Sequence, residues 1–114
     1  MATLTVQKVT RLGITPSFAA CTGGGDKFLP SANTYIELKN TSGGALTVTV
    51  APAKVPIPDT TITFAAVSIP ATTGDKIIGP FPADVFAAAA DGLAAVTYSG
   101  VTSLTIAAFE LSQP

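Results

Sequence analysis

Apolar and polar residues alternate along most of the chain, and this period of two constrains the fold more than any other feature. In Tyr35-Ile36-Glu37-Leu38-Lys39-Asn40 the aliphatic side chains fall on one side and the charged ones on the other. Residues 45–51 alternate in the same way, with valine and leucine against threonine. Thr41-Ser42-Gly43-Gly44 lies between them and carries glycines, which tolerate the positive φ of a tight turn. The pattern predicts a β-hairpin over residues 35–51, with Leu38 and Val48 facing the core.

Five further segments have strand patterns and are separated by turn residues. They are residues 3–9, 61–69, 75–81, 93–99 and 102–111. The last segment is apolar on both faces, which predicts a central position in a sheet or a place against a neighbour. Short strands in this arrangement predict an all-β fold: a single β-sandwich or jelly-roll-like domain with one short helix.

The chain of 114 residues has the length of one domain, so we expect residues 1–114 to form a single β domain. The short helix is expected over residues 82–90, because Pro82 stands at its start and Asp91-Gly92 follow its end. Two loops are expected, at Gly23-Gly24-Gly25-Asp26 and in the proline-rich residues 52–59.

Groups that perform chemistry are scarce in this sequence. Only 11% of the residues are charged, against about 25% in an average protein. The chain has no histidine, so Cys21, its one cysteine, has no imidazole to activate it and is expected to be a small buried apolar residue. We therefore predict no enzyme activity, no catalytic residue, no cofactor and no metal site. One alternative stays open, a hydrolase whose two carboxylates meet only in the folded protein.

Charge and hydropathy also argue against two classes of partner. The net charge is −1 and there is no basic stripe, which argues against binding of nucleic acid through its phosphates. The sequence has no apolar run of about 18 residues, which argues against a membrane span. The first residues lack the basic start and the long apolar run of a signal peptide, so we expect synthesis in the cytoplasm without export.

Apolar residues make up 47% of the chain, more than the predicted core explains easily. Either threonine and alanine make a mildly polar outer surface, or several apolar residues lie in subunit contacts. Four of them fall in predicted loops or at strand ends, where core packing explains them less well. These candidate interface residues are Phe28, Leu29, Phe81 and Phe86.

The N-terminal residues 1–9 have two interpretations. They form either the first strand of the domain or an arm that pairs with a strand edge in its own sheet, in a sister subunit or in a binding partner. In the second case Leu4 and Val6 are the expected anchors, and they join the candidate interface residues.

Several segments, taken in order, resemble a known family. They are Leu4-Thr5-Val6-Gln7, Gly25-Asp26-Lys27-Phe28, Tyr35-Ile36-Glu37-Leu38-Lys39-Asn40, Gly44-Ala45-Leu46-Thr47-Val48-Thr49-Val50, Ile78-Gly79-Pro80-Phe81-Pro82 and the run from Val96-Thr97-Tyr98-Ser99-Gly100 to Leu104-Thr105-Ile106-Ala107-Ala108. Their order is similar to that in the small all-β decoration, or cement, proteins of tailed bacteriophages. Residues 55–59 are unusually rich in proline for this pattern, so the mid-chain loop departs from it.

The resemblance implies a homotrimer on the outer capsid surface of the virion, made in the host cytoplasm, with the major capsid protein as its partner. Such a protein binds the assembled shell better than its separate subunits and stabilises it by mass action, without catalysis. Two other interpretations remain: another phage structural component, such as a head fibre base or a tail protein, and a carbohydrate-binding or adhesion β-sandwich. The latter needs exposed aromatic rings, and the chain has no tryptophan, only Tyr35 and Tyr98 beside its phenylalanines.

Overall fold

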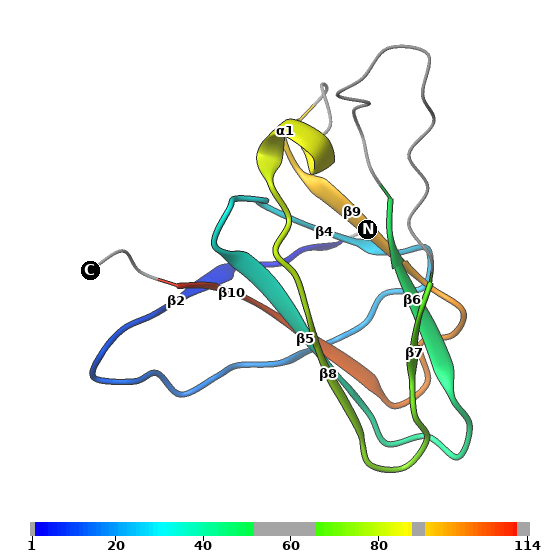
Figure 1. Ribbon diagram of the computed structural model, residues 1–114. Coiled ribbons are helices and arrows are strands. Elements are labelled where there is room, and N and C mark those ends of the chain that lie inside the picture. The colour runs from blue at the N-terminus through cyan, green and yellow to red at the C-terminus, as the bar shows by residue number, and fades with distance from the viewer. Residues whose placement is uncertain (1, 52–65, 88–90, 112–114) are drawn as a thin grey trace.

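The computed structural model describes residues 2–51, 66–87 and 91–111, and strands dominate it (Figure 1). Within these residues ten strands form two sheets. Sheet A has the order β1 (Ala2–Thr3), β4 (Asp26–Phe28), β9 (Ala94–Tyr98), β6 (Leu46–Val50) and β7 (Val67–Ile69). Sheet B has the order β2 (Val6–Val9), β10 (Leu104–Leu111), β5 (Thr34–Asn40) and β8 (Gly74–Ile78), and β3 (Ala19–Ala20) also pairs with β10. The expected all-β, sandwich-like fold is confirmed.

The hydrophobic core lies between the inner faces of the two sheets. Alternate residues of each central strand point inward, as the period of two requires. Their side chains are at most 1% exposed, and they are Ile36, Leu38, Leu104 and Ile106 from sheet B and Val48 and Val96 from sheet A. Full burial of each such side chain stabilises the fold by about 1.5–3 kcal/mol relative to exposure. The predicted inward orientation of Leu38 and Val48 is confirmed.

The predicted hairpin over residues 35–51 is wrong, because its two strands do not pair. Strand β5 pairs with β10 and β8 in sheet B, whereas β6 pairs with β9 and β7 in sheet A. The connection between them therefore arches from one sheet to the other. Alternation determines which side chains are buried, but it does not determine whether two strands pair by backbone hydrogen bonds or face each other across the core. Here β5 and β6 lie in different sheets, and their side chains face each other in the core.

Asn40, the last residue of β5, organises this arch from inside the protein. Its side chain is fully buried and uses all its hydrogen-bonding capacity. Nδ2 donates to the carbonyl oxygens of Gly44 at 3.0 Å and Ile69 at 3.2 Å. Oδ1 accepts from Ser42 N at 2.9 Å and Ser42 Oγ at 2.6 Å. One amide thus joins the arch to the end of β7, and a buried polar group with every partner in place fixes this geometry strongly.

Two more turns meet the arch at this end of the sandwich. The amide of Thr72, in the turn between β7 and β8, donates to Ser42 O at 2.8 Å. The amide of Thr41 donates at 3.0 Å to the oxygen of Ser103, which precedes β10. Gly74 opens β8 so close to the preceding turn that a Cβ there would lie 1.9 Å from Pro70 O. Any residue larger than glycine would therefore push the start of β8 away from the turn at Pro70.

The N-terminal segment is not one strand but two, one in each sheet. Residues Ala2–Thr3 (β1) pair in parallel with β4, and Val6–Val9 (β2) pair in parallel with β10. Between them Leu4 crosses the edge of the sandwich and packs against the core, which divides the strand expected over residues 3–9. Ala2–Thr3 and Val6–Val9 thus pair within the protein's own sheets, an arrangement that both interpretations of residues 1–9 allow.

Strand β10 is central, as its two apolar faces predict. One of its edges pairs with β5 along residues 104–110, and the other pairs with β3 and then with β2. On its outer face Ala107 and Phe109 are still only 3% and 4% exposed. Side chains beyond the sheet must therefore cover them, and these are described below.

One short helix is present, but it is shorter than expected. It covers Ala83–Phe86 (α1), a single turn, where the sequence predicted residues 82–90. Pro82 is its N-cap and has no side-chain hydrogen bond to the helix, and Ala87 is already extended. Phe86 turns into the core at this point, so tertiary packing ends the helix before the alanine run. Residues 88–90 lie outside the described residues.

The other sequence predictions vary in accuracy. Strands expected over residues 93–99 and 102–111 are found within a residue or two as β9 and β10, and the strand expected over 75–81 is found as β8. Only Val67–Ile69 of the strand expected over 61–69 is seen, because residues 61–65, like the proline-rich loop at 52–59, lie outside the described residues. Strands β3 and β4 were missed, since two or three residues show no periodicity.

Truncation of Leu38 tests the two faces of β5. We expect Leu38→Ala to lower the free energy of unfolding by about 2–5 kcal/mol, because it leaves a cavity between the sheets. The neighbouring Lys39→Ala should cost less than about 1 kcal/mol, because Lys39 is exposed and contributes only a contact to the Phe18 ring. Urea unfolding measures both values, and equal losses would contradict the observed orientation of the strand.

Candidate interaction surfaces

Three of the candidate interface residues are core residues, which corrects the sequence prediction. Phe28, Phe81 and Phe86 are 0%, 4% and 6% exposed. Their rings pack edge to face, Phe28 on Phe81 and Phe81 on Phe86, with centroids 5.2 Å apart in both pairs. The error has a clear source: Phe28 belongs to β4, a strand too short to recognise, and Phe81 and Phe86 come from the turn and helix that close over it. Packing inside the subunit therefore explains all three.

The remaining candidates differ in how much of their side chains is free. Leu29 follows β4 and is 59% exposed. Its neighbours hold its backbone, since Pro30 is buried and Ser31 forms a β-bridge with Phe81. Leu4 and Val6 are half-buried and pack against the core, so most of their apolar surface is already used. Leu29 is thus the one candidate whose side chain is mostly available to a partner.

Three large apolar side chains that the sequence did not single out are also exposed. Leu12 is 99% exposed, Ile77 65% and Leu111 52%. Ile77 points outward from edge strand β8, and Leu111 ends β10. Leu12 lies between β2 and β3, in a connection that leaves the body of the protein (Figure 1). A leucine between Arg11 and Gly13, outside any alternating run, was the sequence signal that could have identified it.

A hollow of about 430 Å³ opens where the N-terminal segment crosses between the sheets. We call it the N-terminal hollow. It is lined by residues 2–5 and Gln7 on one side, by Ser17 and Ala19 on the other, and by residues 106–108 of β10. It lies where β3 and β2 pair with consecutive stretches of one edge of β10, residues 105–106 and 108–111, and leave Ala107 between them.

A buried polar cluster lies under β1, where Asp26 opens β4. The Asp26 side chain is fully buried, and its Oδ2 accepts hydrogen bonds from Tyr98 OH at 2.7 Å and Thr22 N at 3.1 Å. Burial by itself raises the pKa of Asp26, but the hydrogen bonds from Tyr98 and Thr22 outweigh it, so the pKa lies below its usual value. Burial and the bond to Asp26 also raise the pKa of Tyr98. The cluster therefore holds a carboxylate and a neutral phenol at neutral pH.

Cys21 belongs to the same cluster and is buried, as the sequence predicted. Burial raises the pKa of its thiol to about 11; a hydrogen bond with Tyr98 opposes this effect and the charge of Asp26 adds to it. A thiol with this pKa stays protonated at neutral pH, and a protonated thiol is a poor nucleophile. Its position is that of a core residue.

Aromatic side chains cover the outer face of sheet B over β10. Tyr35 stacks on Phe109 with ring centroids 5.3 Å apart, and Phe18 meets Phe109 edge to face at 6.3 Å. Lys39 Nζ lies 4.5 Å from the centre of the Phe18 ring. These rings explain the burial of Phe109. They also show that Tyr35 and Tyr98, the aromatic residues considered for sugar binding, both have partners inside the protein, Phe109 and Asp26 respectively.

Two carboxylates that are far apart in the sequence meet on this face. Partial burial raises the pKa of Glu37, and both a hydrogen bond to Asp75 and the negative charge of Asp75 raise it further, while Lys39 opposes them. This is the kind of pair that the hydrolase alternative required. The two residues lie on adjacent strands, β5 and β8, so their approach follows from the register of sheet B.

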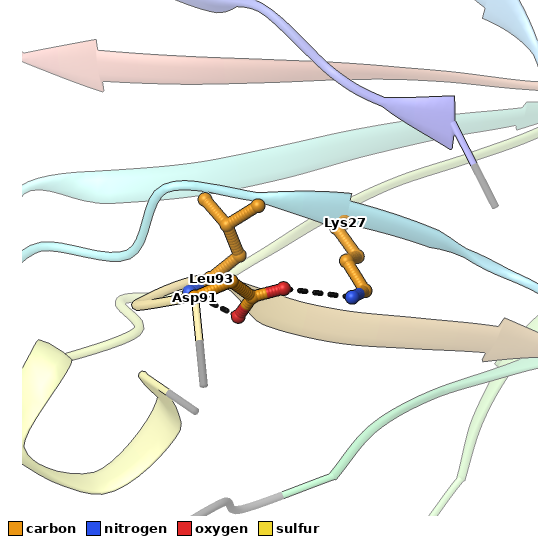
Figure 2. A network of polar contacts seen from close by, with 3 residues as sticks. All are labelled: Lys27, Asp91 and Leu93. Atoms are coloured by element: carbon orange, nitrogen blue, oxygen red, sulfur yellow. Dashed lines mark hydrogen bonds and ion pairs between the residues drawn. The ribbon is translucent and has the colours of Figure 1, made fainter. Parts of the chain in front are cut away.

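A surface ion pair joins β4 to the segment before β9 (Figure 2). Lys27 Nζ lies 2.7 Å from Asp91 Oδ2, and Leu93 N donates to Asp91 Oδ1 at 3.0 Å. The bond from Lys27 and then that from Leu93 lower the pKa of Asp91. Both side chains are about one-third exposed, so the pair positions the strand start more than it stabilises the fold.

Within residues 2–51, 66–87 and 91–111, no three cysteine, aspartate or glutamate side chains gather as a metal site would need. The helix in this part of the chain is too short to cross a membrane. No family model matches the chain, and no curated protein or solved structure matches it either.

The Asp26 cluster predicts a pH dependence of stability. The folded pKa of Asp26 lies below its unfolded value of about 3.9, so the carboxylate stabilises the fold above that pH and the contribution disappears as the pH falls through the folded pKa. Asp26→Asn should therefore lower the free energy of unfolding at pH 7 by about 1–3 kcal/mol and reduce its fall between about pH 5 and pH 2. Urea unfolding across this range measures both effects.

The matched control for this prediction is Asp84→Asn, since Asp84 is an exposed carboxylate in α1. It should leave both the stability at neutral pH and its acid dependence close to those of the unchanged protein. A D26N protein with the full acid dependence would contradict the proposed role of the carboxylate.

Cys21 predicts a difference in thiol reactivity between the folded and unfolded states. At pH 8 the native protein should react with an aromatic disulfide reagent far more slowly than a free thiol, because Cys21 is buried and its pKa is raised to about 11. In guanidinium chloride the same protein should release one equivalent of chromophore rapidly. Rapid labelling of the folded protein would show that the cluster is open to solvent.

Proposed function

We propose that this protein is a structural protein of a virion: a capsid decoration protein, present as a homotrimer, that binds the outer surface of an assembled bacteriophage head and stabilises it without catalysis. The order of strand and turn motifs in the sequence supports this function. So does a two-sheet domain whose polar interior groups, Asn40 and Asp26, are engaged in hydrogen bonds that hold the fold together.

The observation that carries the proposal is the exposure of isolated large apolar side chains on a surface with few charges. Leu29 is the strongest candidate for the contact with the shell, because it is 59% exposed and its backbone is fixed beside the aromatic cluster of Phe28 and Phe81. Because the backbone of Leu29 is already fixed, binding needs to order only its side chain, and the loss of conformational entropy is small. The small share of charged residues in the chain, 11%, reduces the cost of removing water from such a contact.

Mass action explains how such contacts stabilise a shell. A ligand that binds only the assembled state raises the stability of that state in proportion to the logarithm of its concentration over its dissociation constant. Three copies linked in a trimer raise the effective concentration at the second and third contacts, so weak individual contacts add up to lasting attachment. The protein needs no reactive group for this function.

Binding to assembled heads tests the proposal. Purified protein should co-sediment with heads from the same phage that lack it, and should raise the temperature at which those heads release their DNA. Leu29→Asp should weaken the binding at least about tenfold, as expected for an apolar anchor in a desolvated contact. Ile77→Asp is the matched control, because Ile77 is also largely exposed but lies on β8 of the other sheet.

One outcome would contradict the proposed function, and another would contradict only the role of Leu29. Unchanged protein that does not bind heads but does bind tails or head fibres would support the alternative of another phage structural component. Binding to heads that L29D leaves intact would retain the function but exclude Leu29 as its anchor.

A further inference from the structure

The most exposed large apolar side chain in the described residues is Leu12, with 99% of its surface open to solvent. It lies in residues 10–18, the connection between β2 and β3, which runs out from the body of the protein (Figure 1). We call the part of this connection around Leu12, residues 10–15, the Leu12 loop. A leucine presented in this way contributes nothing to the core and exposes its whole side chain to a partner.

Hydrogen bonds hold the Leu12 loop in a defined shape. Gly13 N donates to Thr10 O at 3.0 Å, and Gly13 has a φ of +82°, which a larger residue would adopt only with strain. At the base of the connection the side-chain amide of Gln7 bonds twice to Ser17, with Nε2 donating to O at 2.8 Å and Oε1 accepting from N at 2.9 Å. The loop is therefore built to project Leu12 outward, not to fold it back against the sheet.

The N-terminal hollow has the complementary character. Of its apolar lining residues, Ala2 and Ala19 are exposed and Leu4 is half-buried, whereas Ile106 and Ala108 are themselves fully buried. Thr3, Thr5, Gln7 and Ser17 are the polar residues of its lining, and none of the residues that line it is charged. Arg11, beside Leu12, would thus meet no other cation among the residues that line this site. At about 430 Å³ the hollow is large enough for an aliphatic side chain with its backbone.

We infer that the Leu12 loop of one copy of this chain inserts into the N-terminal hollow of a second copy. The loop and the hollow are different surfaces of the same molecule, so the contact is head-to-tail, and such contacts close into a ring when the rotation between copies allows it. In a ring each copy inserts its Leu12 loop into one neighbour and receives the loop of the other neighbour. Within each copy the loop and the hollow are adjacent, because Gln7 and Ser17 lie at the base of the connection and also line the hollow. The inference rests on the proposed homotrimer and identifies the surfaces that form it.

Mass measurement in solution provides the first test. The unchanged protein should be a trimer by analytical ultracentrifugation at micromolar concentration, and Leu12→Asp should be a folded monomer with an unchanged far-UV circular dichroism spectrum, because the side chain has no contact in the isolated subunit. Its melting temperature should fall only by the amount that association contributes to the trimer. Ile77→Asp, the matched control at another exposed aliphatic residue, should remain a trimer. A monomeric unchanged protein, or an L12D protein that stays trimeric, would overturn the inference.

Cross-linking tests the placement directly. Two single variants, Leu12→Cys and Ala19→Cys, should form a mixed disulfide dimer on oxidation only when they are combined, because Ala19 lines the hollow and is accessible. Cys21 is buried and should not take part. Failure of the mixture to cross-link more than either variant alone would exclude this contact. The decoration function is tested separately, by the binding of L29D and of the unchanged protein to heads. A failure of the loop contact can therefore be distinguished from a failure of the proposed function.

Discussion

The buried amide of Asn40 is the interaction on which the architecture depends most. It ends β5 in one sheet, bonds to the arch that leads into the other sheet, and reaches the end of β7 through Ile69 O. Two neighbouring turns bond to the same arch: Thr72 N donates to Ser42 O, and Ser103 O accepts from Thr41 N. The bond to Ile69 O is buried, and those to Gly44 and Ser42 are partly buried. Loss of the Asn40 side chain would therefore leave the buried Ile69 carbonyl without this partner and release the arch from both of its contacts.

The two ends of the sandwich consequently differ in character. At the Asn40 end, polar groups tie three turns together and leave little room for change. At the edge of the sandwich that holds β1 and β2, the N-terminal segment crosses from one sheet to the other. Only two residues form β1 there, and the N-terminal hollow lies beside the segment. Exposed apolar side chains, above all Leu12, lie in connections and at strand ends outside the Asn40 network. A rigid framework with an open edge is suited to a protein whose function we propose to be attachment.

Sequence reasoning succeeded where a residue's environment follows from its neighbours along the chain. The alternation in β5, β6 and β10 gave the buried face correctly, and the apolar outer face of β10 predicted its central place. It failed for Phe28, Phe81 and Phe86, because β4 has too few residues to show a period and the aromatic cluster joins three separate segments. It also passed over Leu12, whose place outside any alternating run was the only local signal, and the hollow, which depends on β3 and β2 pairing with consecutive parts of one edge of β10.

The sequence by itself determined that this chain folds as a β protein with few reactive groups, and which strand faces are buried, because a period of two and the supply of titratable residues are local properties of the chain. Only the tertiary structure decided which strands pair. The residues around Asn40 carry the same turn signal for a hairpin and for an arch between sheets, and the choice is made by the competing edges of β10, β8, β9 and β7 and by the carbonyl of Ile69, some 29 residues away, that the Asn40 amide reaches.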